Sequence, residues 1–196
     1  MLEIVKKNIA LIIGVVIFII IGNEVYTQIN QKPKSAKSFR LTCHKEGVTF
    51  EKVIKKDLVK SLQQHLKSDD YKLIVWADKS VYMKTVMFNF VDIETIQKDI
   101  KEKFIAYPTN LDTTNKEKKE VLVDIMVYEN DKKDPGKKTT KSKLYAGYLT
   151  ATFKVNKHKV YKIQTDFMSL KGEDIPQRVS CIVKSVMTLG EQNGKK

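Results

Sequence analysis

Residues 9–22 form a run of 14 residues without a charge, and this run constrains the chain more than any other feature. A helix of that length covers about 21 Å, less than the roughly 30 Å hydrocarbon layer of a bilayer. Extension to residues 8–26 gives about 28 Å, with Lys6 and Lys7 before the segment and Tyr26 at its end. Lysine and tyrosine suit the membrane interface. Residues 8–26 are therefore predicted to form a transmembrane helix.

A cleaved export signal and a buried core helix are the alternatives for this segment. Signal cleavage needs small residues in an A-x-A-like arrangement. The only plausible cut follows Gly22, and the residue three positions before this cut is the large Ile20. A core helix of a soluble domain is normally apolar on one face, whereas this segment is apolar all round. An uncleaved signal anchor is favoured, and a cleaved signal is the alternative.

The flanking charges predict the orientation. Lys6 and Lys7 lie closest to the segment, while four basic residues beyond it nearly balance them, and large domains translocate largely regardless of charge. We expect a bacterial inner-membrane protein of single-pass type with its C-terminal domain in the periplasm. The predicted parts are a cytoplasmic N-terminus (1–7), the signal anchor (8–26), a linker (27–38), a periplasmic α+β domain (39–190) and a disordered tail (191–196).

The two cysteines, Cys43 and Cys181, lie near opposite ends of the predicted domain. An even pair in an exported domain favours a disulfide, intramolecular or, as the alternative, intermolecular. An intramolecular bond would tie the first predicted strand to the last predicted helix. Cys181 falls on the helix side away from the apolar stripe, so such a bond requires a segment that covers this outer side.

The apolar pattern predicts nine elements in the order β-α-β-β-α-β-β-β-α, which indicates a largely antiparallel sheet with helices on one face. The predicted strands are 38–43, 71–77, 81–90, 120–128, 143–155 and 160–167. The predicted helices run from Thr49 to about Leu66, from the N-cap Asp92 to before Pro108, and onward from the N-cap Asp174. A tight turn at 156–158 joins the last two strands.

Two predictions within this pattern bear on function. The segment "VYMKTVMFNF" (81–90) could offer an interface, although packing within the sheet is the favoured interpretation. Trp76, in an apolar strand, is expected in the core rather than on a binding platform.

No spacing typical of catalysis or of ligand binding occurs in the chain. His44, His65 and His158 are scattered, and His44 next to Cys43 would face the opposite side of a strand. The chain has eight glycines and no glycine-rich loop after a strand, which disfavours nucleotide binding. We therefore predict no catalytic, metal or cofactor-binding residues, no cofactor and no enzymatic activity.

The formal charge of +13 raises nucleic acid as a partner. Arg40 and Arg178 are the only arginines among 36 basic residues, however, and base-edge and bidentate phosphate contacts favour arginine. The lysines are also spread along the chain. Nucleic acid is therefore disfavoured, and a cytoplasmic, membrane-tethered nucleic-acid binder is the weakest hypothesis.

Two functions suit an anchored domain without recognisable chemistry. The first is a non-catalytic protein-interaction module in an envelope assembly of secretion, conjugation or pilus type, with other envelope proteins or further copies of the chain as partners. The second is a sensory or regulatory partner that binds a small ligand or stabilises a membrane transcription regulator. No residue motif links the chain to a particular family.

Overall fold

The computed structural model describes residues 39–114 and 117–190. The strands are β1 (Thr49–Val53), β2 (Lys72–Asp78), β3 (Val121–Glu129), β4 (Gly147–Val155) and β5 (His158–Phe167), and the helices are α2 (Val59–Lys67), α3 (Ile93–Ala106) and α4 (Ile175–Met187). The predicted N-terminus, signal anchor, linker and tail lie outside these residues. Within the described ranges, no helix has both the length and the apolar character that a membrane span requires.

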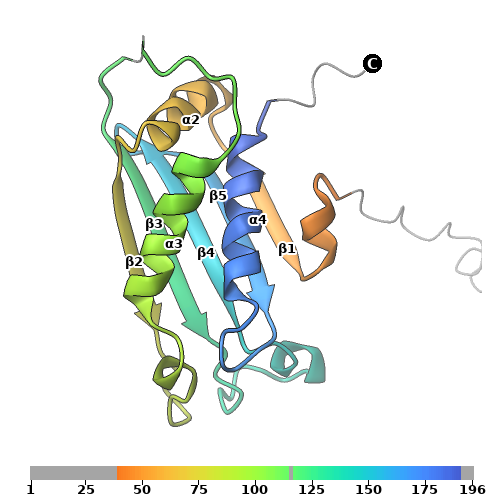
Figure 1. Cartoon of the computed structure of the whole chain (residues 1–196). Helices are drawn as coiled ribbons and strands as arrows, with labels where there is room; N and C mark the ends of the chain where they lie inside the picture. Colours follow the sequence, from red (N-terminus) through yellow and green to blue (C-terminus); the bar gives the residue numbers. More distant parts are fainter. Residues whose placement is uncertain (1–38, 115–116, 191–196) are drawn as a thin grey trace, which may run out of the picture. The chain divides into compact units, whose positions relative to one another are not determined.

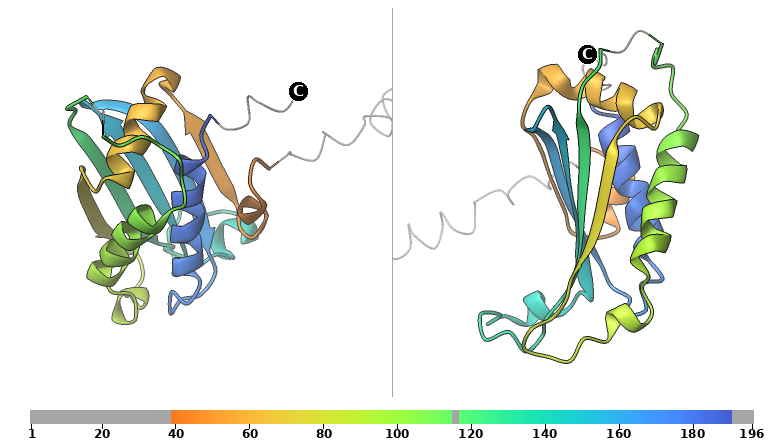
Figure 2. Two further views of the ribbon diagram at one scale, coloured as in Figure 1. Left: turned by 45° about the horizontal axis from the view of Figure 1, so that its top comes forward. Right: turned by 90° about the vertical axis from the view of Figure 1, so that its left-hand side faces the viewer.

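The five strands form one sheet in the order β1-β5-β4-β3-β2. Three pairs are antiparallel and the β2–β3 pair is parallel. The helices lie on one face of this sheet, as the side view in Figure 2 shows, and α3 and α4 run along it (Figure 1). The predicted α+β class is confirmed.

The core lies between the sheet and the helices. Along β3, residues 121, 123, 125 and 127 are buried in alternation, as their period of two predicts. The Phe104 ring of α3 meets the Phe153 ring of β4 edge-on at 6.3 Å between centroids, and Phe153 also contacts Tyr161 of β5. These rings join the helix layer to the middle of the sheet.

The two later helices and the last hairpin agree with prediction. Asp92 caps α3 by accepting hydrogen bonds from the backbone N–H groups of Glu94 and Thr95. Asn156 and Lys157 have φ values of 48° and 68°, the left-handed conformation that a two-residue hairpin turn needs. Pro176 stands in the first turn of α4, where proline suits a helix.

The helix predicted from Thr49 to Leu66 is wrong in its first part. Residues 49–53 form β1, which pairs antiparallel with β5, and only Val59–Lys67 are α-helical. The sequence did not show the alternation of a strand, because the inward-facing position between Thr49 and Val53 is the charged residue Glu51. Its carboxylate is bonded inside the domain by Arg40 and Tyr161.

The strand predicted at 38–43 is also wrong. Residues Thr42–Lys45 form a 3-10 turn packed on α4, and no strand of the described sheet pairs with this segment. In this turn Cys43 and His44 both reach α4, whereas neighbours in a strand would face opposite sides.

The strand predicted at 81–90 is absent from the structure. These residues connect β2 to α3 as a loop with one short 3-10 turn, Met87–Asn89. The connection cannot be a hairpin strand because β2 and β3 are parallel, and parallel neighbours need a crossover, which α3 provides. Trp76 is also misplaced by the prediction, since it lies on the outer face of the sheet, 44% exposed.

Candidate functional site

The loops that follow β2, β3 and β5 emerge at the same end of the sheet, since these strands all run in one direction (Figure 1). We call residues 79–92, 130–146 and 168–174 the loop end. The three loops touch one another: Asp131 binds the backbone of Val81, and Gly172 lies against the side chain of Val91. The loop end is therefore one continuous surface.

A buried carboxylate, that of Glu129, organises this surface from inside. Glu129 is the last residue of β3 and is completely buried. One oxygen accepts hydrogen bonds from the backbone N–H groups of Val86 (2.8 Å) and Met87 (2.9 Å). The other accepts from the hydroxyls of Ser80 (2.7 Å) and Thr85 (2.5 Å). Burial alone would raise the pKa of Glu129, but these four donors lower it to about 2, so the group is an anion at neutral pH.

Asp131, two residues later, fixes the tip of the same loop. Its Oδ2 atom accepts hydrogen bonds from the N–H groups of Val81 (2.7 Å) and Tyr82 (2.5 Å), and Oδ1 accepts from Lys133 N–H. Burial opposes the charge, but these backbone donors lower the pKa of Asp131. No strand among the described residues pairs with loop 79–92. The carboxylates of Glu129 and Asp131 instead accept hydrogen bonds from backbone N–H groups of this loop.

Asn130 holds the β3–β4 connection. Its side-chain amide donates to the carbonyls of Ser142 (3.0 Å) and Tyr145 (2.8 Å), while Lys137 donates to its Oδ1 atom and to the Tyr128 hydroxyl. Residues 129–131 thus anchor two long loops to the end of one strand.

The side chains that these loops present are apolar and large. Seven of the 14 exposed large hydrophobic residues in the described ranges belong to the loop end. They are Val81, Tyr82, Val86, Phe90, Leu144, Met168 and Leu170. Lysines stand among them, at positions 79, 84, 132, 133, 137, 138, 143 and 171. The loop end is therefore an apolar surface interspersed with lysines.

A second polar cluster ties the start of the domain to α4. Four side chains spaced along one side of this helix hold residues 40–46: Arg178, Cys181, Ser185 and Thr188, the last just after the helix end. The Cys43–Cys181 disulfide is present, with 5.8 Å between Cα atoms. Cys181 is buried because this segment covers the outer side of α4, as an intramolecular bond requires.

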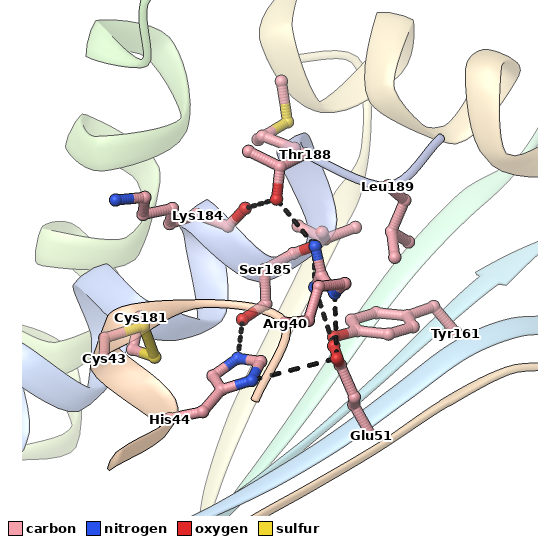
Figure 3. Close-up of polar contacts among 12 residues, drawn as sticks. Arg40, Cys43, His44, Glu51, Tyr161, Cys181, Lys184, Ser185, Thr188 and Leu189 are labelled. Atoms are coloured by element: carbon pink, nitrogen blue, oxygen red, sulfur yellow. Dashed lines mark hydrogen bonds and ion pairs between the residues drawn. A yellow bond between two sulfur atoms is a disulfide. The ribbon is translucent and has the colours of Figure 1, made fainter. Parts of the chain in front are cut away.

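Arg40 lies at the centre of this cluster (Figure 3). Its guanidinium makes a two-bond ion pair with Glu51, at 2.8 and 2.7 Å, and donates to the Ser185 carbonyl (2.7 Å) and the Thr188 hydroxyl (2.8 Å). The Tyr161 hydroxyl donates to Glu51 at 2.5 Å. Burial opposes the negative charge, but the bonds from Arg40 and Tyr161 lower the pKa of Glu51. A cation near the end of α4 also suits the helix dipole.

His44 belongs to the same cluster and is buried. Its Nε2 atom lies 2.8 Å from the Ser185 hydroxyl, and burial lowers its pKa. Ligand atoms of Cys43, His44 and Cys181 lie within 4.8 Å of one another, but both sulfurs are used in the disulfide and do not form a metal site in this state. The other histidines lie apart: His65 bonds the Ser61 carbonyl inside α2, and His158 is exposed at the start of β5.

A surface pocket of about 600 Å³ lies where α4 ends, lined in part by Gln63, Leu111 and Met187. The amide nitrogen of Gln63 donates to the carbonyls of Val186, Met187 and Leu189, at 2.9 to 3.0 Å. Gln63 therefore caps the helix, and its donors are already used.

Sequence reasoning identified Cys43 and Cys181 but missed the carboxylates. Glu129 continues the series 121, 123, 125 and 127, so the period of two places it on the buried face, which is the signal that could have revealed it. The scarcity of arginine was a second signal, because both arginines hold the N-terminal segment against α4.

Comparisons of the chain with protein-family models, with curated proteins and with solved structures gave no match. The functional argument therefore rests on the geometry described above.

Proposed function

We propose that the chain is a single-pass inner-membrane protein whose domain of residues 39–190 lies in the periplasm and acts as a non-catalytic docking module for other envelope proteins. The loop end is the docking surface. The observation that carries this proposal is that an apolar surface is held in a fixed shape by buried carboxylates.

Rigidity supports docking for an energetic reason. A loop that is ordered before binding loses less conformational entropy when a partner binds. The side chains of Val81 and Tyr82 are exposed, while their backbone N–H groups bond to Asp131. The loop tip is therefore ordered before a partner binds. The lysines among these apolar residues favour a partner that presents acidic side chains together with apolar ones.

The disulfide supports the compartment. Disulfides persist in oxidising compartments and are rare in the cytosol. Fusions of alkaline phosphatase and, separately, of green fluorescent protein to the C-terminus test this in a Gram-negative host. Phosphatase activity without fluorescence is expected, together with thiols that resist labelling. Fluorescence with labelled thiols would contradict the periplasmic location.

Site-specific photo-crosslinking tests the docking surface. A photoreactive amino acid at Tyr82 or Phe90, in the full chain in native membranes, should give a discrete crosslinked product. The same amino acid at Lys162, exposed on the outer sheet face, is the control. Crosslinking at Lys162 equal to that at Tyr82 and Phe90, or no crosslinked product at Tyr82 and Phe90, would contradict the proposal.

Ligand binding is the alternative, with the pocket at the end of α4 as its candidate site. The donors of Gln63 are already used there, which weakens this alternative. Thermal stabilisation of the full chain by bile salts or lipids would revive it.

A further inference from the structure

The edge of the sheet formed by β2 is open along seven residues. β2 pairs only with β3, and no other strand in the described ranges contacts its far side. The right-hand view of Figure 2, in which this edge faces the viewer, shows the helices set to one side of it. Alternate residues of an edge strand direct their N–H and C=O groups away from the sheet, where they can pair with another strand.

This edge lacks the usual protection against pairing. Edge strands are commonly shortened or interrupted by proline, bulges or inward-facing charges. β2 has none of these features, and its outer face carries Ile74, 38% exposed, and Trp76, 44% exposed. The opposite edge strand, β1, has five residues, and its inward-facing Glu51 is charged.

The sequence of β2 is complementary to itself in the antiparallel direction. When two copies pair with Val75 opposite Val75, Lys72 stands opposite Asp78 of the other copy at both ends. The same register places Ile74 opposite Trp76, twice, on the outer face. A shift by two residues in either direction loses both charge pairs, so one register is favoured.

We propose that the partner of this edge is a second copy of the chain, and that two domains pair through antiparallel β2 strands to form one ten-stranded sheet. A two-fold axis at Val75, perpendicular to the sheet, relates the copies. It keeps the helices of both copies on the same face and leaves both loop ends free. This inference goes beyond the docking proposal, because the β2 edge is a different surface of the domain from the loop end.

Cysteine substitution in the full chain, solubilised in detergent micelles, tests the register. Cys43 and Cys181 are bonded to each other, so an added cysteine is the free thiol. Directly opposite residues have Cβ atoms about 5 Å apart, whereas Leu73 lies about 14 Å from Leu73 of the other copy in this register. We expect Val75→Cys to form disulfide dimers on mild oxidation, and Leu73→Cys and Ala77→Cys to form them only when mixed with each other. Equal self-crosslinking at positions 73, 75 and 77 would overturn the register.

Light scattering on the same micelles tests the association itself. Trp76→Lys should raise the dimer dissociation constant by about tenfold or more, because it removes apolar contact and adds charge on the edge. Phe50→Lys is the matched control, since Phe50 is an exposed aromatic residue on the outer face of the opposite edge strand. Asp78→Lys should also weaken the dimer, and Lys72→Asp in addition should restore it. Monomeric wild-type chain, or equal effects of Trp76→Lys and Phe50→Lys, would overturn the proposal.

The two proposals fail separately. Tyr82→Ser should abolish the photo-crosslink at Phe90 and leave the dimer intact, while Trp76→Lys should do the reverse. A dimer without crosslinks at the loop end would end the docking proposal alone, and crosslinks without a dimer would end the self-association alone.

Discussion

The guanidinium of Arg40 binds both carboxylate oxygens of Glu51, so the first residues of the domain are joined to the edge strand β1 by a two-bond ion pair. Arg40 also bonds the Ser185 carbonyl and the Thr188 hydroxyl at the end of α4. One side chain therefore connects the N-terminal segment, an edge strand and the last helix.

Arg40→Met should destabilise the domain by about 1 to 3 kcal/mol, because it leaves the half-buried Glu51 carboxylate without its cation. Urea unfolding of the oxidised chain measures this change. Arg40→Lys keeps the charge but loses the two-bond geometry, so its stability should lie between that of Arg40→Met and that of the wild type. An unchanged midpoint for Arg40→Met would contradict the role of this contact.

The stability of the domain should decrease in acid because of Glu129. Its folded-state pKa is about 2, below the usual value of 4.5, so its contribution is complete above about pH 4.5 and disappears as the pH falls towards 2. The free energy of unfolding should fall by about 2 to 3 kcal/mol over this range. Denaturant unfolding from pH 6 to pH 2 measures it. Glu129→Gln should be less stable at pH 6 and show a flatter profile, and a parallel profile would refute the assignment.

The tip of loop 79–92 should lose its order when Asp131 is replaced. Asp131→Ala removes the acceptor of the Val81 and Tyr82 N–H groups, so these two amides should exchange with deuterium much faster, while β3 and β4 stay protected. Asp134→Ala is the control, because Asp134 is an acidic residue of the same end that bonds only its own turn, at Gly136. Equal exchange at Val81 in both variants would contradict the anchoring role of Asp131.

Prediction from sequence succeeded where burial follows a regular period. The series 121–127 of β3 and the stripe of Ile96, Ile100 and Phe104 on α3 are buried as their spacing requires. Such elements bury one face against a common core, so local spacing contains the needed information.

Prediction failed where buried polar groups replace that pattern. Glu51 interrupts the apolar alternation of β1, and its partner Arg40 is 11 residues away. Residues 81–90 alternate like a strand, but their N–H groups bond to carboxylates more than 40 residues later. Partners so distant leave no mark in a local window, so the loop end was missed as an organised surface.

Removal of the disulfide should cost about 5 kcal/mol, the chain-entropy value for a closed loop with a sequence separation of 138. The double variant Cys43→Ser, Cys181→Ser avoids an unpaired thiol, and thermal unfolding compares it with the wild type. Addition of dithiothreitol should lower the wild-type midpoint to that of the variant and leave the variant unchanged. A variant as stable as the oxidised wild type would show that Arg40, His44 and Arg178 alone hold the segment.

The pairing of β1 with β5 sets the order in which this domain can close. Thr49 stands opposite Thr165, so the first strand has no neighbour until almost the whole domain is available. Such long-range pairing slows folding, and it leaves β1 without its strand partner while the chain is still emerging from the ribosome. The disulfide also forms late, because Cys181 is synthesised after β5. The domain therefore completes its fold only after nearly its full length has been synthesised, because both the β1 pairing and the disulfide need residues near its end.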